Sequence, residues 1–201
     1  RIPASYCGII GYKPSSLLCS NKDLILLSHT YDSIGFMSNK VNNINNIFNI
    51  INSFNYKNKK SVRRIEKIKC LIPTQALEGD ISPDVCRDFK IIISKLKKNN
   101  IDFEIKSLDC WSPNYHRKSL LKIIENEGAQ NLSSLINNNK SKITINLRNN
   151  LLFGKNITKE TIKTLRYDLN DLKNRIKSTF EEYDLIIMPT TPQNSFNISN
   201  K

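Results

Sequence analysis

The chain has 201 residues, enough for one large domain or part of one, and 31 Lys and Arg against 18 Asp and Glu give it a net charge of +13. Asn, Ile and Lys together account for 79 of the 201 residues along the whole sequence. Because their codons are rich in A and T, a biased genome explains this skew, and the charge is weak support for a nucleic-acid partner. A bilayer-spanning segment is excluded, since no apolar run approaches about 20 residues.

The first 40 residues predict loops and short strands. Short apolar runs alternate there with glycines and a proline, which are turn-forming residues. After Lys40 the apolar residues recur at spacings of three and four, and this stripe predicts an amphipathic helix over residues 41–54, with Ser38 as its N-cap.

The middle of the chain predicts a β-α-β unit. Residues 67–72 are an apolar strand that Pro73 ends, and Ser82, Pro83 and Asp84 form a helix start with a cap, a fixed φ and a favourable charge. A helix over 83–98 is then followed by an alternating strand over 101–105. Such a unit favours parallel strands joined by a right-handed crossover.

The second half predicts two long helices and a buried strand. Residues 120–136 form the first helix, interrupted at Gly128, and residues 158–182 form the second, with an apolar packing stripe. Residues 185–188 are the strand. We therefore expect an α/β fold in which the three strands share one mixed, mostly parallel sheet, flanked by the helices at 83–98 and 158–182.

The cations are scattered and need no nucleic acid to explain them. The two densest runs are residues 57–64, in a polar connector over 55–64, and residues 95–98, at a helix C-terminus where Lys complements the helix dipole. Residues 137–142 are a further polar loop, rich in Asn.

The sequence predicts neither a metal site nor a cofactor. The five Cys residues are odd in number and form no CxxC pair, so we expect unpaired thiols in a reducing, cytoplasmic compartment. His29 and His116 are the only histidines, and no glycine-rich phosphate loop or GxSxG elbow is present. A local triad of a Ser with His29 and Asp32 is disfavoured, because triads are recognised by geometry and such proximity in sequence is common.

Residues 1–14 read Arg-Ile-Pro-Ala-Ser-Tyr-Cys-Gly-Ile-Ile-Gly-Tyr-Lys-Pro. This string resembles the amidase signature family, in which Gly-Gly-Ser-x-Arg-x-Pro-Ala-x-x-Cys-Gly continues into Gly-x-Lys-Pro. Three later segments are similar to family segments in order and approximate spacing. Residues 27–35 resemble a segment ending in Asp-Thr-x-Gly, residues 127–132 resemble Glu-Ala-x-x-Asn-Leu, and residues 184–192 resemble a strand ending in Pro-Thr-Thr-Pro.

The resemblance implies that residues 1–201 are the central to C-terminal portion of a single amidase domain, truncated at both ends, because family members are typically more than twice this long. It also implies a Ser-Ser-Lys triad whose nucleophile stands two positions before Arg1 and whose other members lie further upstream, so no catalytic residue is expected within the chain. Arg1 matches the Arg after the nucleophile and would brace the nucleophile loop. A solvated Arg1 is the alternative.

Within the chain, the resemblance makes Thr30 and Tyr31 candidates for the wall of the acyl pocket, with ordinary loop residues as the alternative. The sequence departs from the family at two places. Phe36 stands where the family usually has Pro, and Asn replaces the acidic residues expected early in the helix at 41–54.

The function implied first is hydrolysis of a small carboxamide to the acid and ammonia, because residues 28–32 and 127–132 look more like the arylacetamide branch, such as indoleacetamide and mandelamide hydrolases. The alternative is the A subunit of the glutamyl-tRNA amidotransferase, which would need partner subunits. A third alternative, a non-catalytic remnant or nucleic-acid-binding module, rests on the +13 charge alone. No membrane partner is expected.

Overall fold

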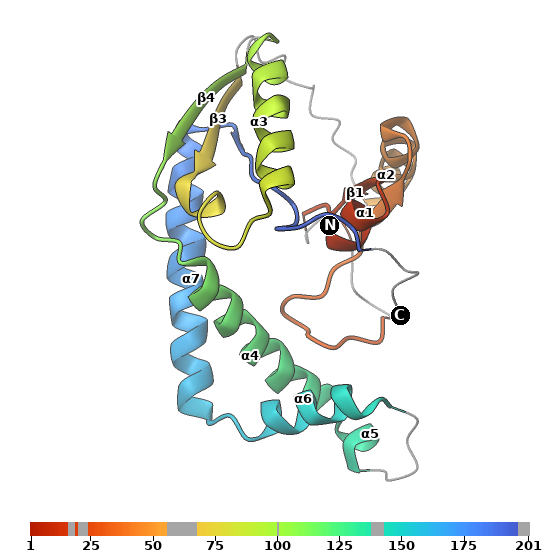
Figure 1. The fold of residues 1–201 in the computed structure, drawn as a ribbon. Coiled ribbons are helices and arrows are strands. Elements are labelled where there is room, and N and C mark those ends of the chain that lie inside the picture. The colour runs from red at the N-terminus through yellow and green to blue at the C-terminus, as the bar shows by residue number, and fades with distance from the viewer. Residues whose placement is uncertain (16–18, 20–23, 56–67, 100, 138–142, 197–201) are drawn as a thin grey trace. The chain divides into compact units, whose positions relative to one another are not determined.

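The computed structural model describes residues 1–15, 19, 24–55, 68–99, 101–137 and 143–196 (Figure 1). The predicted connectors at 55–64 and 137–142 lie almost entirely outside these ranges. The chain forms two compact units. We call residues 1–20, 33–108 and 179–201 the sheet unit, and residues 21–32 and 109–178 the helical unit.

The sheet unit contains a three-stranded parallel sheet in the order β4-β3-β5. β3 (Ile68–Pro73) pairs along its whole length with β4 (Ile101–Lys106), and its middle pairs with the short strand β5 (Leu185–Ile186). The prediction that the three strands share one sheet is confirmed. β3 is the central strand, paired on both edges, and its residues Cys70, Leu71 and Ile72 are buried.

Polar contacts fix β5 beside β3. The Asp184 carboxylate accepts a hydrogen bond from the Lys69 backbone N–H at 2.9 Å, and the Asp184 N–H donates to the Lys69 carbonyl at 2.9 Å. The Lys69 ammonium lies 2.9 Å from the Glu182 carboxylate and 4.6 Å from the Tyr183 ring centroid. Asp184, in the segment that resembled the family, therefore sets the register of the strand after it.

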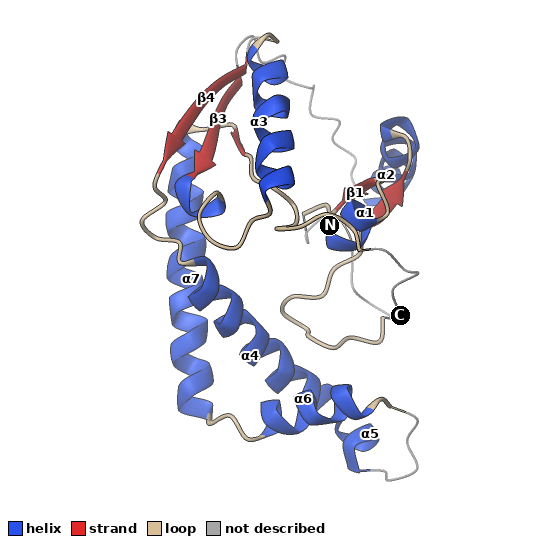
Figure 2. Cartoon of the chain, in the orientation of Figure 1, coloured by secondary structure: helices blue, strands red, loops and turns tan. Residues whose placement is uncertain are grey.

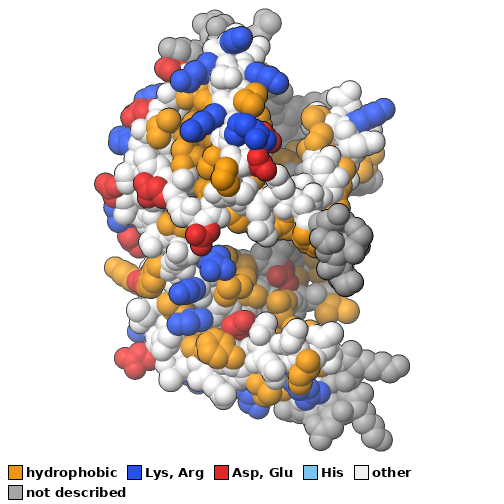
Figure 3. Space-filling model, viewed as in Figure 1, with side chains coloured by type: hydrophobic (Ala, Val, Ile, Leu, Met, Phe, Trp, Pro, Cys, Tyr) orange, Lys and Arg blue, Asp and Glu red, His pale blue; other side chains and the backbone are white. Residues whose placement is uncertain are grey.

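The helix α3 (Pro83–Lys97) lies against β4 and begins as predicted (Figure 1). The Ser82 hydroxyl accepts from the Val85 N–H, Pro83 occupies the first turn, and two lysines occupy the last turn. Phe89 is its buried residue. Ile91 and Ile92 remain about half exposed, and hydrophobic side chains lie among Lys and Arg over this helix in Figure 3.

The N-terminal part of the sheet unit holds a helix that the sequence did not predict. α1 (Ile2–Tyr6) is too short for a periodic pattern to reveal it, and Pro3 is tolerated because the first turn of a helix needs no N–H donor. β1 (Ile10–Tyr12) follows and pairs antiparallel with β2 (Phe36–Ser38). A Cβ on Gly11 would stand 2.7 Å from the Ala4 Cβ, so this glycine lets β1 approach α1.

The departure at Phe36 has a physical account. Phe36 is opposite Tyr12 in the β1–β2 register, and their rings stack with centroids 6.5 Å apart. The Tyr12 ring also meets the edge of Phe48 at 5.4 Å. The aromatic pair thus stabilises a strand position where proline would remove a backbone donor.

The helix predicted at 41–54 is confirmed as α2 (Val41–Asn55), but its predicted cap is wrong. Ser38 is the last residue of β2, and its hydroxyl accepts from the Lys40 backbone N–H and the Asn43 side-chain amide, both at 3.2 Å. These bonds stabilise the turn before the helix. Ile44 is buried, whereas Val41 and Ile47 are about half exposed.

The helical unit has no strand among its described residues (Figure 2). It comprises α4 (Pro113–Asn131), α5 (Ser133–Asn137), α6 (Ile145–Lys155) and most of α7 (Lys159–Glu182). The helix predicted at 158–182 is confirmed. α6 was not predicted, and the helix predicted at 120–136 starts earlier, at Pro113, and breaks at Leu132.

The predicted interruption at Gly128 is wrong, because α4 continues through it. A Cβ there would stand 2.5 Å from the Leu27 Cδ1 and 2.9 Å from the Leu151 Cδ2, so the missing side chain makes room for its neighbours. Gly154 on α6 is tighter still, since its Cβ would stand 2.2 Å from the carbonyl group of Glu125. These two glycines let α4 pack closely on α6 and on the segment before Ser28.

Two apolar clusters hold the helical unit together. In one, Ile123, Ile162 and Leu165 are buried with Tyr31 packed beside them. In the other, Ala129, Ile136 and Leu151 are buried with Leu27 beside them. The stripe predicted on the last long helix thus supplies core residues.

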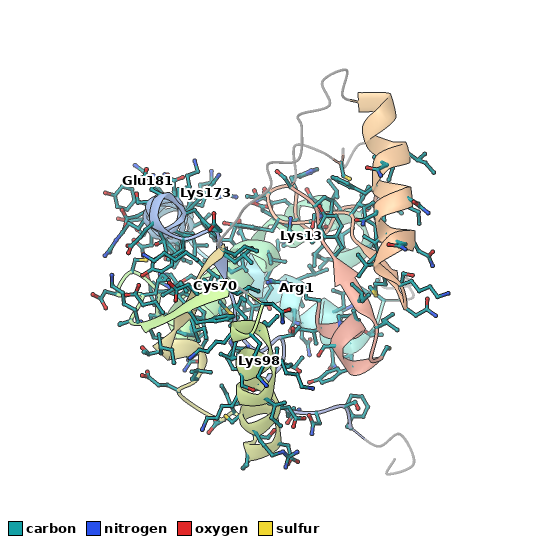
Figure 4. All side chains as sticks on the ribbon, turned by 90° about the horizontal axis from the view of Figure 1, so that it is seen from above. Arg1, Lys13, Cys70, Lys98, Lys173 and Glu181 are labelled. Atoms are coloured by element: carbon teal, nitrogen blue, oxygen red, sulfur yellow. The ribbon has the colours of Figure 1, made fainter. Side chains whose placement is uncertain are left out.

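All five cysteines are unpaired, as predicted. Cys70, labelled in Figure 4, lies on β3 and is fully buried, and this burial raises the pKa of its thiol. No helix in the described ranges combines the length and the apolar character that a bilayer span requires.

Candidate functional site

The loop at residues 28–32 carries both predicted pocket residues, Thr30 and Tyr31, and its own hydrogen bonds fold it into a tight turn. The Asp32 carboxylate accepts from the backbone N–H groups of Leu27 at 2.7 Å and Ser28 at 3.1 Å. The Asp32 N–H donates to the Ser28 carbonyl, and the Tyr31 N–H donates to the Ser28 hydroxyl, both at 3.1 Å. Asp32 therefore holds the turn by binding its first backbone donors.

Glu127 of α4 is the centre of a polar network with this loop. Its Oε2 accepts from the Ser28 hydroxyl at 2.6 Å and from the Thr30 N–H at 3.1 Å. Its Oε1 accepts from the Thr30 hydroxyl at 2.6 Å and from the Arg166 guanidinium of α7. The Arg166 guanidinium also donates to the Thr30 hydroxyl at 3.4 Å. We call Ser28, Thr30, Glu127 and Arg166 the Glu127 clamp.

The clamp keeps Glu127 ionised although the residue is only 6% exposed. Burial disfavours the charged carboxylate, but the hydrogen bonds from Ser28, Thr30 and Arg166 outweigh it and lower the pKa of Glu127 to about 2. Arg166 is 43% exposed on its side chain, so it joins the buried carboxylate to the surface. A buried charge with four donors is the arrangement that keeps such a group stable in a protein interior.

The clamp joins two of the segments that resemble the family. Glu127 binds residues 28 and 30, and the Asn131 side-chain amide donates to the Leu27 carbonyl at 3.1 Å. Residues 127–132 therefore bind the first residues of the 27–35 segment. Sequence reasoning missed Arg166, because a single cation on a basic helix gives no signal of its distant partner.

The two predicted pocket residues, Thr30 and Tyr31, make different kinds of contact. The Thr30 hydroxyl donates a hydrogen bond to the Glu127 carboxylate, so its proton is already used in a bond within the protein. Tyr31 packs on the Ile123–Ile162–Leu165 cluster. Burial raises the pKa of Tyr31, the Arg166 charge lowers it, and the Glu127 charge raises it again. Thr30 is thus positioned by the clamp, and Tyr31 by apolar packing.

Arg1, labelled in Figure 4, is exposed at the start of α1, and its side chain does not cap this helix. Its carbonyl accepts from the Ser5 N–H at 2.9 Å. The Ser5 hydroxyl lies 3.3 Å from the Thr191 hydroxyl, and the Pro192 carbonyl accepts from the Ser82 N–H at 2.8 Å. The first and last resembling segments therefore meet within the sheet unit.

The bonds of Ser28 and Asp32 give both side chains structural roles, in keeping with the disfavoured local triad. Within the described ranges, no group of three or more His, Cys, Asp or Glu side chains is placed to hold a metal ion.

Comparison with known proteins identifies the family. The amidase family model matches residues 1–201. Among curated proteins, the chain is similar to the A subunit of the mitochondrial glutamyl-tRNA(Gln) amidotransferase of Podospora anserina, with 45% identity over 42 residues, which are 21% of this chain and 8% of that protein.

Solved structures agree on the fold. A crystal structure of an amidase is matched with a TM-score of 0.86 and 17% identity, over 100% of this chain and 44% of that one. A bacterial aryl acylamidase of the amidase signature family is matched with a TM-score of 0.68 and 12% identity, over 98% of this chain and 45% of that one. The chain thus spans less than half the length of these relatives. It shares their α/β fold, and the match of the family model along its whole length shows that it belongs to the amidase family.

Proposed function

We propose that the full-length protein cleaves a carboxamide, R-CO-NH2, and releases ammonia through an acyl-enzyme. The observation that carries the proposal is the amidase family match along residues 1–201, supported by the fold shared with solved amidases. The five unpaired thiols are consistent with the reducing, cytoplasmic setting that belongs to the same proposal.

In this mechanism the Ser expected two positions before Arg1 attacks the amide carbon. A Lys acting as base through a second Ser takes the proton from the nucleophile and returns it to the leaving nitrogen, so that the C–N bond breaks and ammonia departs. Water then hydrolyses the acyl-enzyme. No metal or cofactor takes part in the proposed steps.

The role proposed for this chain is to hold the acyl group. We assign the pocket wall to Thr30 and Tyr31, with Tyr31 as its apolar surface. The Glu127 clamp supports this assignment, because four hydrogen bonds to one carboxylate leave the loop little freedom. A preformed apolar wall with few polar groups is the usual design of a small-molecule site. The proposal also includes Arg1 as the brace of the nucleophile loop.

The test of the chemistry uses the full-length gene product without any partner protein. Ammonia release from indole-3-acetamide or mandelamide is expected, and replacing the Ser two positions before Arg1 by Ala is expected to abolish it. Absence of release from every small amide tested, from a folded sample, would contradict a partner-independent hydrolase.

The test of the pocket wall compares two tyrosines of the helical unit. Tyr31→Ala is expected to raise KM for an aromatic amide more than for a small aliphatic amide, because it removes an apolar surface. Tyr167→Ala, at a tyrosine exposed on α7, is the matched control and is expected to change neither KM. Equal effects of the two substitutions on KM would show that Tyr31 is not part of the pocket wall.

A second candidate is the A subunit of a glutamine-dependent amidotransferase. The 45% identity over 42 residues to such a protein supports it, whereas the arylacetamide branch is supported by the likeness of residues 28–32 and 127–132. In this case the carboxamide is that of glutamine. Ammonia release from glutamine that appears only with partner subunits and charged tRNA would establish it and reverse the order of the two candidates.

A further inference from the structure

The helical unit contains a second feature that the proposed reaction does not use. A cavity of about 520 Å³ opens between its helices and is lined by ten described residues. They include the apolar residues Ala129, Ile136 and Ile162 and the basic residues Lys155, Lys159 and Arg166. Its volume lies in the range of small-molecule sites, about 300–1,000 Å³.

The lining is divided into an apolar and a basic part. Ala129, Ile136 and Ile162 are buried core residues, so the apolar part belongs to the fixed packing of the unit. Lys155 ends α6 and Lys159 begins α7, and both are exposed. These two lysines therefore line the same cavity as the apolar residues.

The charge of the lining is of one sign. Three of the ten residues are cations and none is Asp or Glu. Arg166 is paired with Glu127, which neutralises it, whereas Lys155 and Lys159 come from opposite sides of the turn between α6 and α7. Lys159 also stands at the N-terminus of a 24-residue helix, where the macrodipole adds partial positive charge. The potential in the cavity therefore favours an anion.

The amide side chains of the wall are partly held in place. The Asn126 amide donates to the Gly154 carbonyl at 2.9 Å, and the Gln130 amide donates to the Asn126 side-chain oxygen at 3.1 Å. This chain of bonds fixes the amides of both residues without using any lysine. The ammonium groups of Lys155 and Lys159 are then the groups available to meet an incoming anion.

We propose that this cavity binds a small organic anion that carries a carboxylate on an apolar body. The apolar body would lie against Ala129, Ile136 and Ile162, and the carboxylate would lie at Lys155 and Lys159. The Arg166 guanidinium already donates to the Glu127 carboxylate and to the Thr30 hydroxyl, so lysine ammonium groups acting as point charges supply the recognition. The inference stands whether or not the proposed amidase activity is correct.

The experiment measures binding to the full-length protein by calorimetry, with phenylacetate as the probe. Phenylacetone has nearly the same shape, has no charge and contains no amide bond to cleave. Inorganic phosphate carries charge without an apolar body. Phenylacetate is expected to bind at least about tenfold more tightly than either, because only it satisfies both parts of the lining. Equal binding of phenylacetone, or of phosphate, would overturn the proposal.

Variants locate the site. Replacing both Lys155 and Lys159 by Gln is expected to weaken phenylacetate binding by about tenfold, since two nearby charges are lost. The matched control replaces Lys173 and Lys177 by Gln, which removes the same charge from exposed positions of α7 outside the cavity (Lys173 is labelled in Figure 4). Equal weakening in both variants would show only a general charge effect and overturn the proposal.

A measurement on the unaltered protein gives an independent check. Raising the salt concentration from about 0.05 to about 0.5 M is expected to weaken phenylacetate binding and to leave phenylacetone binding unchanged, because salt screens the exposed lysines and not apolar contacts. Salt-independent binding of phenylacetate would contradict the role of the two lysines.

Discussion

Replacing Glu127 by Gln tests the clamp most directly. Gln keeps the size of the side chain but replaces one oxygen by an NH2 group. Each carboxylate oxygen accepts two hydrogen bonds, from Ser28 and the Thr30 N–H on one side, and from the Thr30 hydroxyl and Arg166 on the other. Whichever way the amide is turned, its NH2 group therefore faces a donor that cannot accept, either the Thr30 N–H or the Arg166 guanidinium.

Two arguments give the same magnitude for the loss of folding stability that Glu127→Gln causes. Removing one partner of a buried ion pair costs about 3–5 kcal/mol, and Arg166 is half exposed and regains water, which favours the lower end. The pKa of Glu127 falls from 4.5 to about 2 on folding, which corresponds to about 3 kcal/mol of preference for the charged form. We therefore expect Glu127→Gln to lower the free energy of unfolding by about 3 kcal/mol at pH 7.

The pH dependence has a definite sign. The pKa of Glu127 is lower in the folded than in the unfolded protein, so its stabilisation is complete well above pH 4.5 and is lost as the pH falls toward 2. The stability difference between wild type and Glu127→Gln should therefore shrink to about half its neutral value at pH 3. The difference should not grow in acid.

The assay is urea denaturation of the full-length protein, followed by circular dichroism at pH 7 and pH 3. Glu125→Gln is the matched control, two residues away on α4, because burial raises the pKa of Glu125 and makes its charge unfavourable. This control is expected to keep or increase stability at pH 7. If both variants unfold at the same urea concentration, the hydrogen bonds to Glu127 do not stabilise the protein and the reasoning is refuted.

Packing and the implied triad give three further predictions. Gly154→Ala should lower the free energy of unfolding by about 3 kcal/mol, because its Cβ would overlap the Glu125 carbonyl, whereas Asn150→Ala on an exposed position of α6 should change it little; urea denaturation decides. Thiol titration of the denatured chain without reductant should count five free thiols, and three or one would reveal a disulfide. Residues 1–201 expressed alone should release no ammonia from amides; release above background from a folded monomer would place the catalytic residues inside the chain.

The elements that depend on local signals could be predicted from the amino-acid sequence. The cap at Ser82 with Pro83, the stripe of α2 and the alternation of β4 act within a few residues, so the β-α-β unit and α2 were predicted with bounds close to the observed ones. The resembling strings at the two ends of the chain were enough to identify the family. The resembling segment at residues 127–132 also drew attention to Glu127, though not to its partners.

The features that depend on contacts between distant residues could not be predicted from the sequence and became visible in the folded chain. Gly128 looked like a helix break, but it is required because Leu27 and Leu151 fill the space of its side chain. The partner of Glu127 is Arg166, and no local pattern pairs two residues on different helices. The residue type of a glycine or a charged residue does not reveal its role. That role depends on the atoms that folding brings within a few ångströms of the residue.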